Sequence, residues 1–525
     1  MSESRVPGNG ELILSIDAGT QSMRAGLVDL AGNIHGLVKI PIEPYFSPQP
    51  GLAEQNPVYY WQMLCQTTRQ LLADNPGAAA RLRAVTLATQ RHTFVNVDRD
   101  GNELRPAIVW LDQRKADMRK VLPGWGIALS RAVHQHQLFQ YATESCRSNW
   151  VRQNQPDIWA KTYKYLFLSG YLSHRLTGEF RDSGGNMLGT VPFDVKEGAW
   201  AAGRDLKRTL FPIEADKLPE VVPPAGLLGH VTARAAEESG IPAGLPMIAG
   251  SNDKACDVIG SGCLTPEQAC ISFGTTATLN TQISKYVELR PFLAPYPSAI
   301  PGQFYTEVSV FRGLWLVSWF KEEFGLRERQ MAEGTNTTPE ELLEQLVRDV
   351  PAGSMGLVCQ PLWTPGPELH PATKGAIFGF GDVHTRAHVY RAILEGLVFA
   401  LKEGGALTQA KNKVEFTEIR ATGGGSRSDS IVQMTADIFG LPVRRPHTPE
   451  TSVLGAAIDA AVGLGVYPDV PAATAGMTRI GDSFDPHPET EKIYRDLYER
   501  VYLKAYDRLL PLNREIQRIV GYPPI

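Results

Sequence analysis

Cysteine is scarce in this sequence, and no two cysteines form a Cys-x-x-Cys pair. The chain has 525 residues and only six cysteines. Three of them, Cys256, Cys263 and Cys270, recur every seven residues, but no histidine lies among them to complete a tetrahedral metal site. We therefore expect small buried side chains at these positions, and neither a disulfide framework nor a metal centre.

Long apolar runs and a strong net charge are also missing. No run approaches the roughly 18 apolar residues that span a bilayer, and residues 1–11 lack the apolar stretch of a secretory signal. Lysine and arginine number 52 and aspartate and glutamate 56, which gives a net charge of −4. This balance gives no electrostatic reason to expect nucleic acid or a membrane as partner. We expect a cytoplasmic protein that acts on a small molecule.

The length and the pattern of segments predict two large α/β domains. The chain is about three to four times the usual single-domain size. Its 43% of hydrophobic and 21% of charged residues supply an ordinary core and exclude disorder of the whole chain. Strand-like runs alternate with helical patterns, which is typical of an α/β architecture. Among these patterns we expect strands at 84–88, 107–110 and 245–249 and helices at 156–178 and around 493–501.

An internal duplication is the most informative feature of the organisation. The apolar run 12–16 enters the turn 17–20, and a second strand-like run follows at 23–30. Residues 269–279 repeat this pattern of strand, Gly-Thr turn and strand about 255 residues later. The repeat predicts two halves of similar size, residues 1–258 and 259–525.

The two Gly-Thr turns and a later run of three glycines predict a nucleotide site between the halves. Such turns bring backbone N–H groups and a hydroxyl to one concave surface that suits phosphate oxygens, and glycines allow a flat base to approach the backbone. Taken alone, each motif is equally well a plain connection between strands or between strand and helix. The candidate contacts are Gly19, Thr20, Ser22, Arg24, Gly274, Thr275, Thr276, Gly423, Gly424, Gly425 and Ser428.

Acidic residues end two of the predicted strands. Asp17 ends a buried strand directly before the first turn, where a hydrated Mg²⁺ is the natural partner of a carboxylate. Asp253 ends the strand 245–249 and its short extension, just before a helix. It suits a general base that accepts a hydroxyl proton, although an ordinary helix N-cap is the competing interpretation.

Polar clusters follow two other strands of the first half, where ligands of open α/β sheets bind. The candidate substrate contacts are Gln90, Arg91, His92, Trp110 and Asp112. A polyhydroxy compound needs paired donors and acceptors of this kind, with an aromatic face such as Trp110 to lie against. For His92 alone, a structural histidine is about as good an interpretation as a substrate contact.

Taken in order, these segments resemble the FGGY family of carbohydrate kinases, within the superfamily of actin, sugar kinases and heat-shock ATPases. The resemblance covers nearly the whole chain and implies two duplicated actin-like, ribonuclease H-like domains with an interdomain cleft for ATP and sugar. The matching segments are 17–22 with Arg24, 105–114, 172–178 with Asp182, 240–253, 422–426 running to Asp437, and 451–460.

The resemblance also implies roles and cofactors. Asp253 is the implied general base, Asp17 the ligand of a Mg²⁺-bound water, and Thr20 and Thr275 the phosphate contacts. Gly423 and Gly424 are implied to flank the adenosine of ATP. Lys254, directly after the base, departs from the family's usual pattern.

The substrate follows less directly from the resemblance. Gln90 and Arg91 resemble glycerol kinases, whereas His92 matches the position where xylulokinases place histidine. We expect an ATP-dependent kinase of a small sugar or polyol, with a ketopentose such as xylulose or ribulose favoured. Another polyol, a linear autoinducer-like substrate and a catalytically silent binding protein stay open, as does a homodimer.

Overall fold

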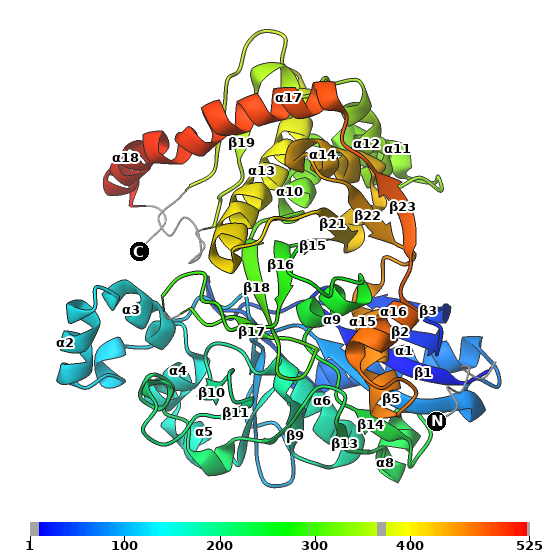
Figure 1. The fold of residues 1–525 in the computed structure, drawn as a ribbon. Coiled ribbons are helices and arrows are strands. Elements are labelled where there is room, and N and C mark those ends of the chain that lie inside the picture. Colours follow the sequence, from blue (N-terminus) through cyan, green and yellow to red (C-terminus); the bar gives the residue numbers. More distant parts are fainter. Residues whose placement is uncertain (1–9, 292, 365–373, 522–525) are drawn as a thin grey trace.

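Two α/β halves, each built on a mixed sheet, make up the molecule (Figure 1). The computed structural model describes residues 10–291, 293–364 and 374–521. Within these ranges, no helix combines the length and the apolar character needed to cross a membrane.

The first half is organised around a six-stranded sheet in the order β13-β14-β5-β1-β2-β3. β1, β2 and β3 form an antiparallel meander, β5 and β14 run parallel to β1, and β13 is antiparallel to β14. Their bounds are β1 (Leu12–Ala18), β2 (Ser22–Asp29), β3 (Ile34–Pro41), β5 (Leu82–Thr89), β13 (Leu227–His230) and β14 (Pro246–Ile248).

The second half repeats this topology strand for strand. In the order β18-β16-β15-β21-β22-β23, the first three strands are antiparallel neighbours, β15, β21 and β22 are parallel, and β23 is antiparallel to β22. The duplicated α/β architecture predicted from the two hairpins is thereby confirmed. The bounds are β15 (Gln268–Phe273), β16 (Ala277–Ile283), β17 (Tyr296–Pro297) on the edge of β18 (Phe304–Val310), β21 (Glu418–Thr422), β22 (Val443–Pro446) and β23 (Ile480–Phe484).

Two equivalent helices join the halves. α9 (Asp253–Gly260) follows β14 and α15 (Thr451–Gly463) follows β22, and the two pack against each other (Figure 1). A Cβ on Gly260 would lie 2.1 Å from the Thr451 carbonyl oxygen, and one on Gly455 would lie 2.1 Å from that of Cys256. Glycine at these two positions therefore permits the close approach of the helices. The predicted division after residue 258 falls inside α9 and stays a prediction.

Other helices cover the sheets and extend from them. α1 and α6 (Leu168–Thr177) pack on the first sheet, and α13 and α14 belong to the core of the second half. The bounds are α1 (Pro57–Asp74), α2 (Gly124–Ala132), α3 (His136–Glu144), α4 (Arg147–Asn154), α7 (Leu206–Leu210), α8 (Ala233–Ser239), α10 (Trp315–Phe324), α11 (Leu326–Ala332), α12 (Pro339–Arg348), α13 (Arg386–Asn412), α14 (Asp429–Phe439) and α16 (Val470–Met477).

The helix predicted for residues 156–178 is wrong as a single element. The segment forms α5 (Pro156–Lys161), β8 (Lys164–Phe167) and α6 (Leu168–Thr177). β8 pairs with β6 (Phe94–Val97), and the rings of Tyr165 and Phe94 stack at 5.0 Å. Pairing with a distant strand thus overrides the local helical pattern.

Two further predicted elements differ in extent. The strand expected at 107–110 is only β7 (Ala107–Ile108), and it belongs with β4 (Glu54–Gln55) and β6 to a small separate sheet. The last amphipathic helix is longer than expected, because α17 (Pro488–Leu497) continues through a π-helical turn into α18 (Leu503–Val520).

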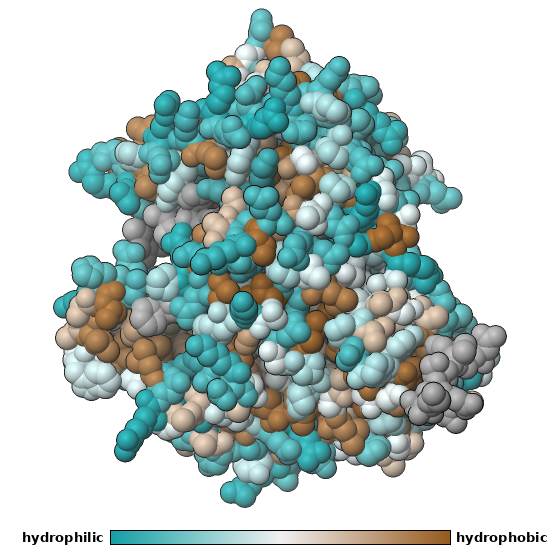
Figure 2. All heavy atoms as spheres, viewed as in Figure 1, coloured by the Kyte–Doolittle hydropathy of each residue, from teal (hydrophilic) through white to brown (hydrophobic). Residues whose placement is uncertain are grey.

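The cysteines lie inside the molecule, and the surface is mostly hydrophilic, as in a protein with an apolar core. All six cysteines are buried and free, as the sequence predicts. On the face shown in Figure 2 most of the surface is hydrophilic, with scattered apolar patches, one of them over α2 and α3 at the left edge. Leu129 of α2 is among the exposed apolar residues.

We predict that Gly455→Ala destabilises the protein, because the added Cβ would overlap the Cys256 carbonyl and force α9 and α15 apart. Overpacking of this kind costs about 1–3 kcal/mol of unfolding free energy. Gly203→Ala is the matched control, since a Cβ at Gly203 meets nothing within 4 Å. Denaturant unfolding of both variants measures the difference, and equal stabilities would contradict the proposed helix contact.

Candidate active site

The carboxyl ends of parallel strands gather the candidate residues of each half. In the first sheet, Asp17 and Ala18 of β1 pair with Ala88 and Thr89 of β5, and Gln90 N–H donates to the Ala18 carbonyl at 2.9 Å. In the second sheet, Ser272 of β15 pairs with Thr422 of β21. Each half therefore presents its turns at one sheet edge, where open α/β sheets bind ligands.

The first Gly-Thr turn is linked to two predicted substrate contacts. Gly19 N–H donates to the Ser22 carbonyl at 3.1 Å and closes the turn. The Thr20 hydroxyl accepts from Trp110 Nε1 at 2.9 Å and donates to Gln90 Oε1 at 3.2 Å. The structure thus brings Thr20, Gln90 and Trp110 into one chain of hydrogen bonds.

Asp17 carries a buried oxygen without a protein partner. Its Oδ2 pairs with Arg24 at 2.9 Å, whereas Oδ1 is buried and accepts no hydrogen bond from any residue that the structure describes. Burial raises the pKa of Asp17 to about 6, against the lowering effect of Arg24, and the carboxylates of Asp253, Asp257 and Glu450 raise it further. An orphaned carboxylate oxygen in such a place fits a Mg²⁺-bound water.

Arg24 contacts two carboxylates of this cluster, and the described side chains offer few further ligands to a metal ion. The Arg24 guanidinium lies 3.7 Å from the Glu450 carboxylate as well as beside Asp17, so it is held in the cluster between the halves. In the part of the chain that the structure describes, no three His, Cys, Asp or Glu side chains converge on a metal site. A Mg²⁺ here would therefore depend on water and phosphate for most of its ligands.

The second Gly-Thr turn offers a hydroxyl without a protein partner. Gly274 and Thr275 accept at their carbonyls from Leu314 N–H at 3.0 Å and Trp315 N–H at 3.3 Å, and the Thr276 hydroxyl donates to the Phe311 carbonyl. The Thr275 side chain makes no hydrogen bond with any described residue. Thr275 is therefore the hydroxyl of this turn that can receive a phosphate.

The three glycines at 423–425 have different surroundings. A Cβ on Gly423 would lie 2.8 Å from the Phe273 carbonyl oxygen, and one on Gly425 would lie 2.4 Å from the Leu314 side chain. Only Gly424 faces open space, with nothing within 4 Å, so it is the position that a nucleoside can approach. Ser428 is the N-cap of α14, where its hydroxyl accepts from Ile431 N–H.

Asp253 is the first residue of α9 and is not its N-cap. The Asn252 side chain fills the capping role by accepting from Lys254 and Ala255 N–H. The Asp253 carboxylate is 27% exposed and lies 3.6 Å from Arg91 Nε. Burial raises the pKa of Asp253, while Lys254 and Arg91 oppose that rise. The capping interpretation therefore no longer accounts for Asp253.

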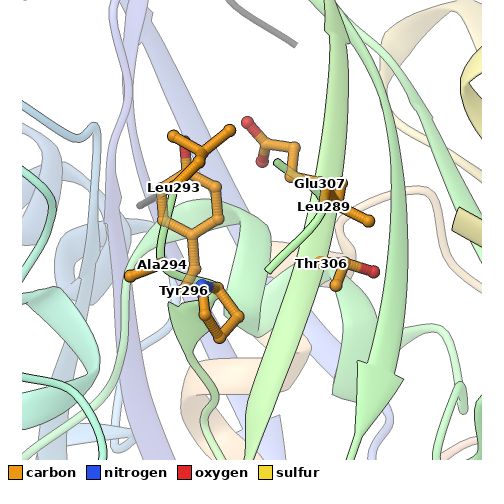
Figure 3. Close-up of a pocket in the computed structure, with 7 residues that line it drawn as sticks. Leu289, Leu293, Ala294, Tyr296, Thr306 and Glu307 are labelled. Carbon is orange, nitrogen blue, oxygen red and sulfur yellow. The ribbon is translucent and has the colours of Figure 1, made fainter. Parts of the chain in front are cut away.

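Arg91 reaches across to the second half. It pairs with Glu307 of β18 at 2.9 Å, lies 3.3 Å from the Tyr305 hydroxyl, and sits over the ring of Tyr296 at 5.2 Å. Leu293 and Tyr296 face Glu307 around a pocket of about 10 Å³, close to the smallest space that holds one water (Figure 3). The sequence reasoning missed Glu307 and Tyr305, for which the signal is a single charged residue inside the strand-forming run 304–310.

His92 is held in a strained backbone conformation beside Arg91. Its φ of 55° lies in the left-handed region, which is uncommon for residues other than glycine. Burial lowers the pKa of His92 to about 3, and the charges of Arg91 and Arg147 reinforce that effect. The imidazole is therefore neutral at physiological pH.

Asp112 is engaged in a local network. Its carboxylate accepts from Arg114 Nε at 2.7 Å and from the N–H groups of Arg114 and Ala53. The side chain is fully buried. The structure therefore turns this carboxylate toward Arg114 and Ala53 and shows no contact between Asp112 and Arg91, His92 or Asp253.

The sequences of both halves of this chain match known proteins. Residues 12–260 match the N-terminal domain, and residues 269–464 the C-terminal domain, of the FGGY family of carbohydrate kinases. The chain is 31% identical to the uncharacterized sugar kinase YgcE of Escherichia coli, with 96% of each chain covered. It is 26% identical to the xylulose kinase of Lactococcus lactis, over 96% of this chain and 98% of the relative.

Two other proteins extend this picture. The autoinducer-2 kinase of Photorhabdus laumondii is 27% identical to this chain, over 93% of it and 92% of the relative. The crystal structure of a xylulose kinase from Rhodospirillum rubrum superposes with a TM-score of 0.78 at 25% identity, covering 96% of this chain and all of that one. The names of these relatives give xylulose for two of them and autoinducer-2 for a third.

We predict that the free energy of unfolding falls less at acid pH in His92→Asn than in the wild type. Because folding lowers the pKa of His92 below its unfolded value of about 6.5, protonation favours the unfolded state, and stability is lost as the pH falls below that value. Asparagine tolerates the left-handed conformation and cannot bind the proton. Urea unfolding at about pH 7.5 and about pH 5 measures the difference.

His134→Asn is the matched control for this prediction, since His134 has the same left-handed backbone, with φ 56°, but is exposed. It makes the same residue change in the same backbone conformation, and His92→Asn should reduce the acid loss more than this control does. An identical acid loss in His92→Asn and the wild type would contradict the lowered pKa of His92.

Proposed function

This chain belongs to the FGGY family of carbohydrate kinases and is a sugar kinase, and on that premise we propose the reaction it catalyses. The γ-phosphoryl group of ATP passes to a hydroxyl of a neutral ketose or polyol, with a ketopentose such as xylulose or ribulose favoured. The observation that supports this most is Asp253, a partly exposed carboxylate at the start of α9 that faces Arg91 and the second half.

Asp253 acts as the general base in this proposal. It accepts the proton of the substrate hydroxyl as that oxygen attacks the γ-phosphorus, while the bond to the β-phosphate oxygen breaks and ADP leaves. Thr275, with backbone N–H groups of both turns, holds the phosphate oxygens, and Thr20 contributes when its hydroxyl turns from Gln90 Oε1 to a phosphate oxygen. Asp17 would hold a Mg²⁺ through water, and the ion, when bound, neutralises charge on the phosphates.

The charge balance around Asp253 favours a neutral substrate. Arg91 is paired with Glu307 and lies near Asp253, and Lys254 is paired with Asp257. Both cations that flank the base are therefore matched by carboxylates of the protein. A substrate carboxylate placed between them would meet negative charge without a free cation to receive it.

A sugar acid is the second candidate, because one cation near His92 lacks a carboxylate partner. Arg147 donates to the carbonyl oxygens of Ser145, Trp110 and Asp112 and makes no ion pair with any described residue. Its Nε is buried and has no hydrogen-bond partner within the described ranges. A linear aldonate bound with its far end at Arg147 would use this group.

An ADP-release assay over a panel of substrates tests the proposed function. The panel holds pentuloses, hexuloses, pentitols and glycerol as neutral compounds, a linear dihydroxy ketone of the autoinducer type, and aldonates as anionic ones. We expect turnover with a neutral ketose or polyol and none with aldonates. ADP release that no compound stimulates would contradict the proposal and favour a silent binding protein.

A cytoplasmic location and a homodimer stay predictions. Neither follows from the residues of the site. Light scattering on the purified full chain gives the mass in solution, and twice the chain mass of 57.6 kDa is the result expected for a homodimer.

We predict that Asp253→Asn abolishes transfer and leaves nucleotide binding nearly intact. The amide cannot accept the hydroxyl proton, and general-base catalysis contributes about 10²–10⁴-fold to the rate. ADP affinity by calorimetry and kcat with the best substrate of the panel check the two halves of the statement. Near-normal turnover would remove Asp253 from its role as the base.

We predict that Asp17→Ala weakens the Mg²⁺ dependence of turnover much more than sugar binding. The substitution removes the orphaned oxygen that suits a Mg²⁺-bound water. Mg²⁺ titrations of kcat and of the sugar KM separate the two effects. Asp29→Ala is the control, because Asp29 also ends a strand but binds Asn33 and His35 in a turn. A collapsed sugar affinity with normal Mg²⁺ dependence would contradict the assignment of Asp17.

A further inference from the structure

Lys254 places a buried ammonium between the two halves. It is the second residue of α9, and its side chain is 13% exposed. Nζ donates to the Ser272 hydroxyl at 2.8 Å and lies 3.3 Å from Asp257 Oδ2. Ser272 belongs to β15, two residues before the Gly274 turn. The ammonium therefore connects the helix of the general base to the strand that leads into the second phosphate turn.

Asp257 completes this connection with donors from three elements. Besides Lys254 of its own helix, it accepts from the Ser272 hydroxyl at 3.0 Å. Its other oxygen accepts from the hydroxyls of Thr451 at 2.7 Å and Ser452 at 2.8 Å, both at the start of α15. A fully buried carboxylate with this many donors fixes the geometry of α9, β15 and α15 relative to one another.

The same ammonium is a major counter-charge of Asp253. Burial alone would disfavour the charged form of Lys254, but Asp257 and Asp253 outweigh it and raise the pKa of Lys254, so the side chain stays protonated. Lys254 and Arg91 in turn lower the pKa of Asp253 against its burial. The charged and titratable groups that face Asp253 are Lys254 and Asp257 of α9, Arg91 after β5, Tyr305 and Glu307 of β18, and Asp17 of β1.

We propose that Lys254 is a positioning residue of phosphoryl transfer, which fixes Asp253 relative to the second phosphate turn through Asp257 and Ser272 and keeps the base ionised. The inference rests on the proposed function. It assigns two separable effects to one side chain, a geometric one through Ser272 and an electrostatic one through its charge. Misplacing a reacting group by about 1 Å costs on the order of a hundredfold in rate, so the geometric effect is measurable.

Three variants separate these effects in the full-length protein, assayed with Mg²⁺-ATP and the best substrate of the panel. Lys254→Met should lower kcat by roughly tenfold to a hundredfold and move the acidic limb of the kcat–pH profile to higher pH, because loss of the cation raises the pKa of Asp253. Lys254→Arg keeps the charge and should restore the position of that limb. Ser272→Ala removes the geometric link without changing any charge and should lower kcat with the limb at its wild-type pH.

Lys402→Met is the matched control, because it removes a lysine whose contact is structural only. The Lys402 ammonium also donates to a buried partner, the Ile438 carbonyl at 2.6 Å, and it lies on α13 within the second half. This variant should lower the melting temperature and leave kcat and the pH profile unchanged.

Wild-type kcat and an unshifted limb in Lys254→Met would overturn the inference, and so would a profile like that of Lys402→Met. If Lys254→Met does not fold, Ser272→Ala decides, and wild-type turnover in that variant overturns the geometric link. Failure of the proposed function shows itself differently, as turnover retained by Asp253→Asn. Inactive Asp253→Asn together with normal Lys254 variants would overturn this inference alone.

Discussion

Buried charges at the junction of the two halves are the constraint on which the rest of the structure depends. Arg24 of the first half lies between Asp17 and Glu450, and Arg91 of the first half binds Glu307 of the second. An unpaired buried charge costs several kcal/mol. These ion pairs therefore favour one relative position of the two halves, in which each cation lies beside its carboxylates. The groups that this arrangement brings together are the ones that the proposed phosphoryl transfer needs: the proposed base Asp253, the orphaned oxygen of Asp17 and the two Gly-Thr turns.

The duplicated topology explains why these groups come from both halves. Each sheet ends its parallel strands at one edge, and each half contributes one helix, α9 or α15, to the contact between them. The start of α9 carries Asp253, and the start of α15 supplies hydroxyls to Asp257. One structural unit, used twice, thus supplies candidate residues from both halves, and Gly260 and Gly455 permit the close contact of α9 and α15.

The sequence predicted the parts of the site that depend on local chemistry. The Gly-Thr turns and Asp17 stand at strand ends as expected, because a turn motif next to an apolar run reports its own geometry. Asp253 lies before the body of the predicted helix, but as the first residue of α9 and not at the end of β14. Contacts between distant segments could not be predicted in this way. The partner of Arg91 is Glu307, more than two hundred residues away, and Asp112 has its hydrogen bonds satisfied by Arg114 and Ala53. The strand β8 was predicted as helix because its partner β6 lies elsewhere in the chain.

The most direct test of the account is to follow the γ-phosphoryl group itself. The purified protein is incubated with Mg²⁺ and ATP labelled in the γ-phosphate, together with either neutral sugars and polyols or aldonates, and the products are identified by mass spectrometry. The account predicts that the label appears on a hydroxyl of a neutral ketose or polyol. Label found only in inorganic phosphate, or only on an aldonate, would contradict it.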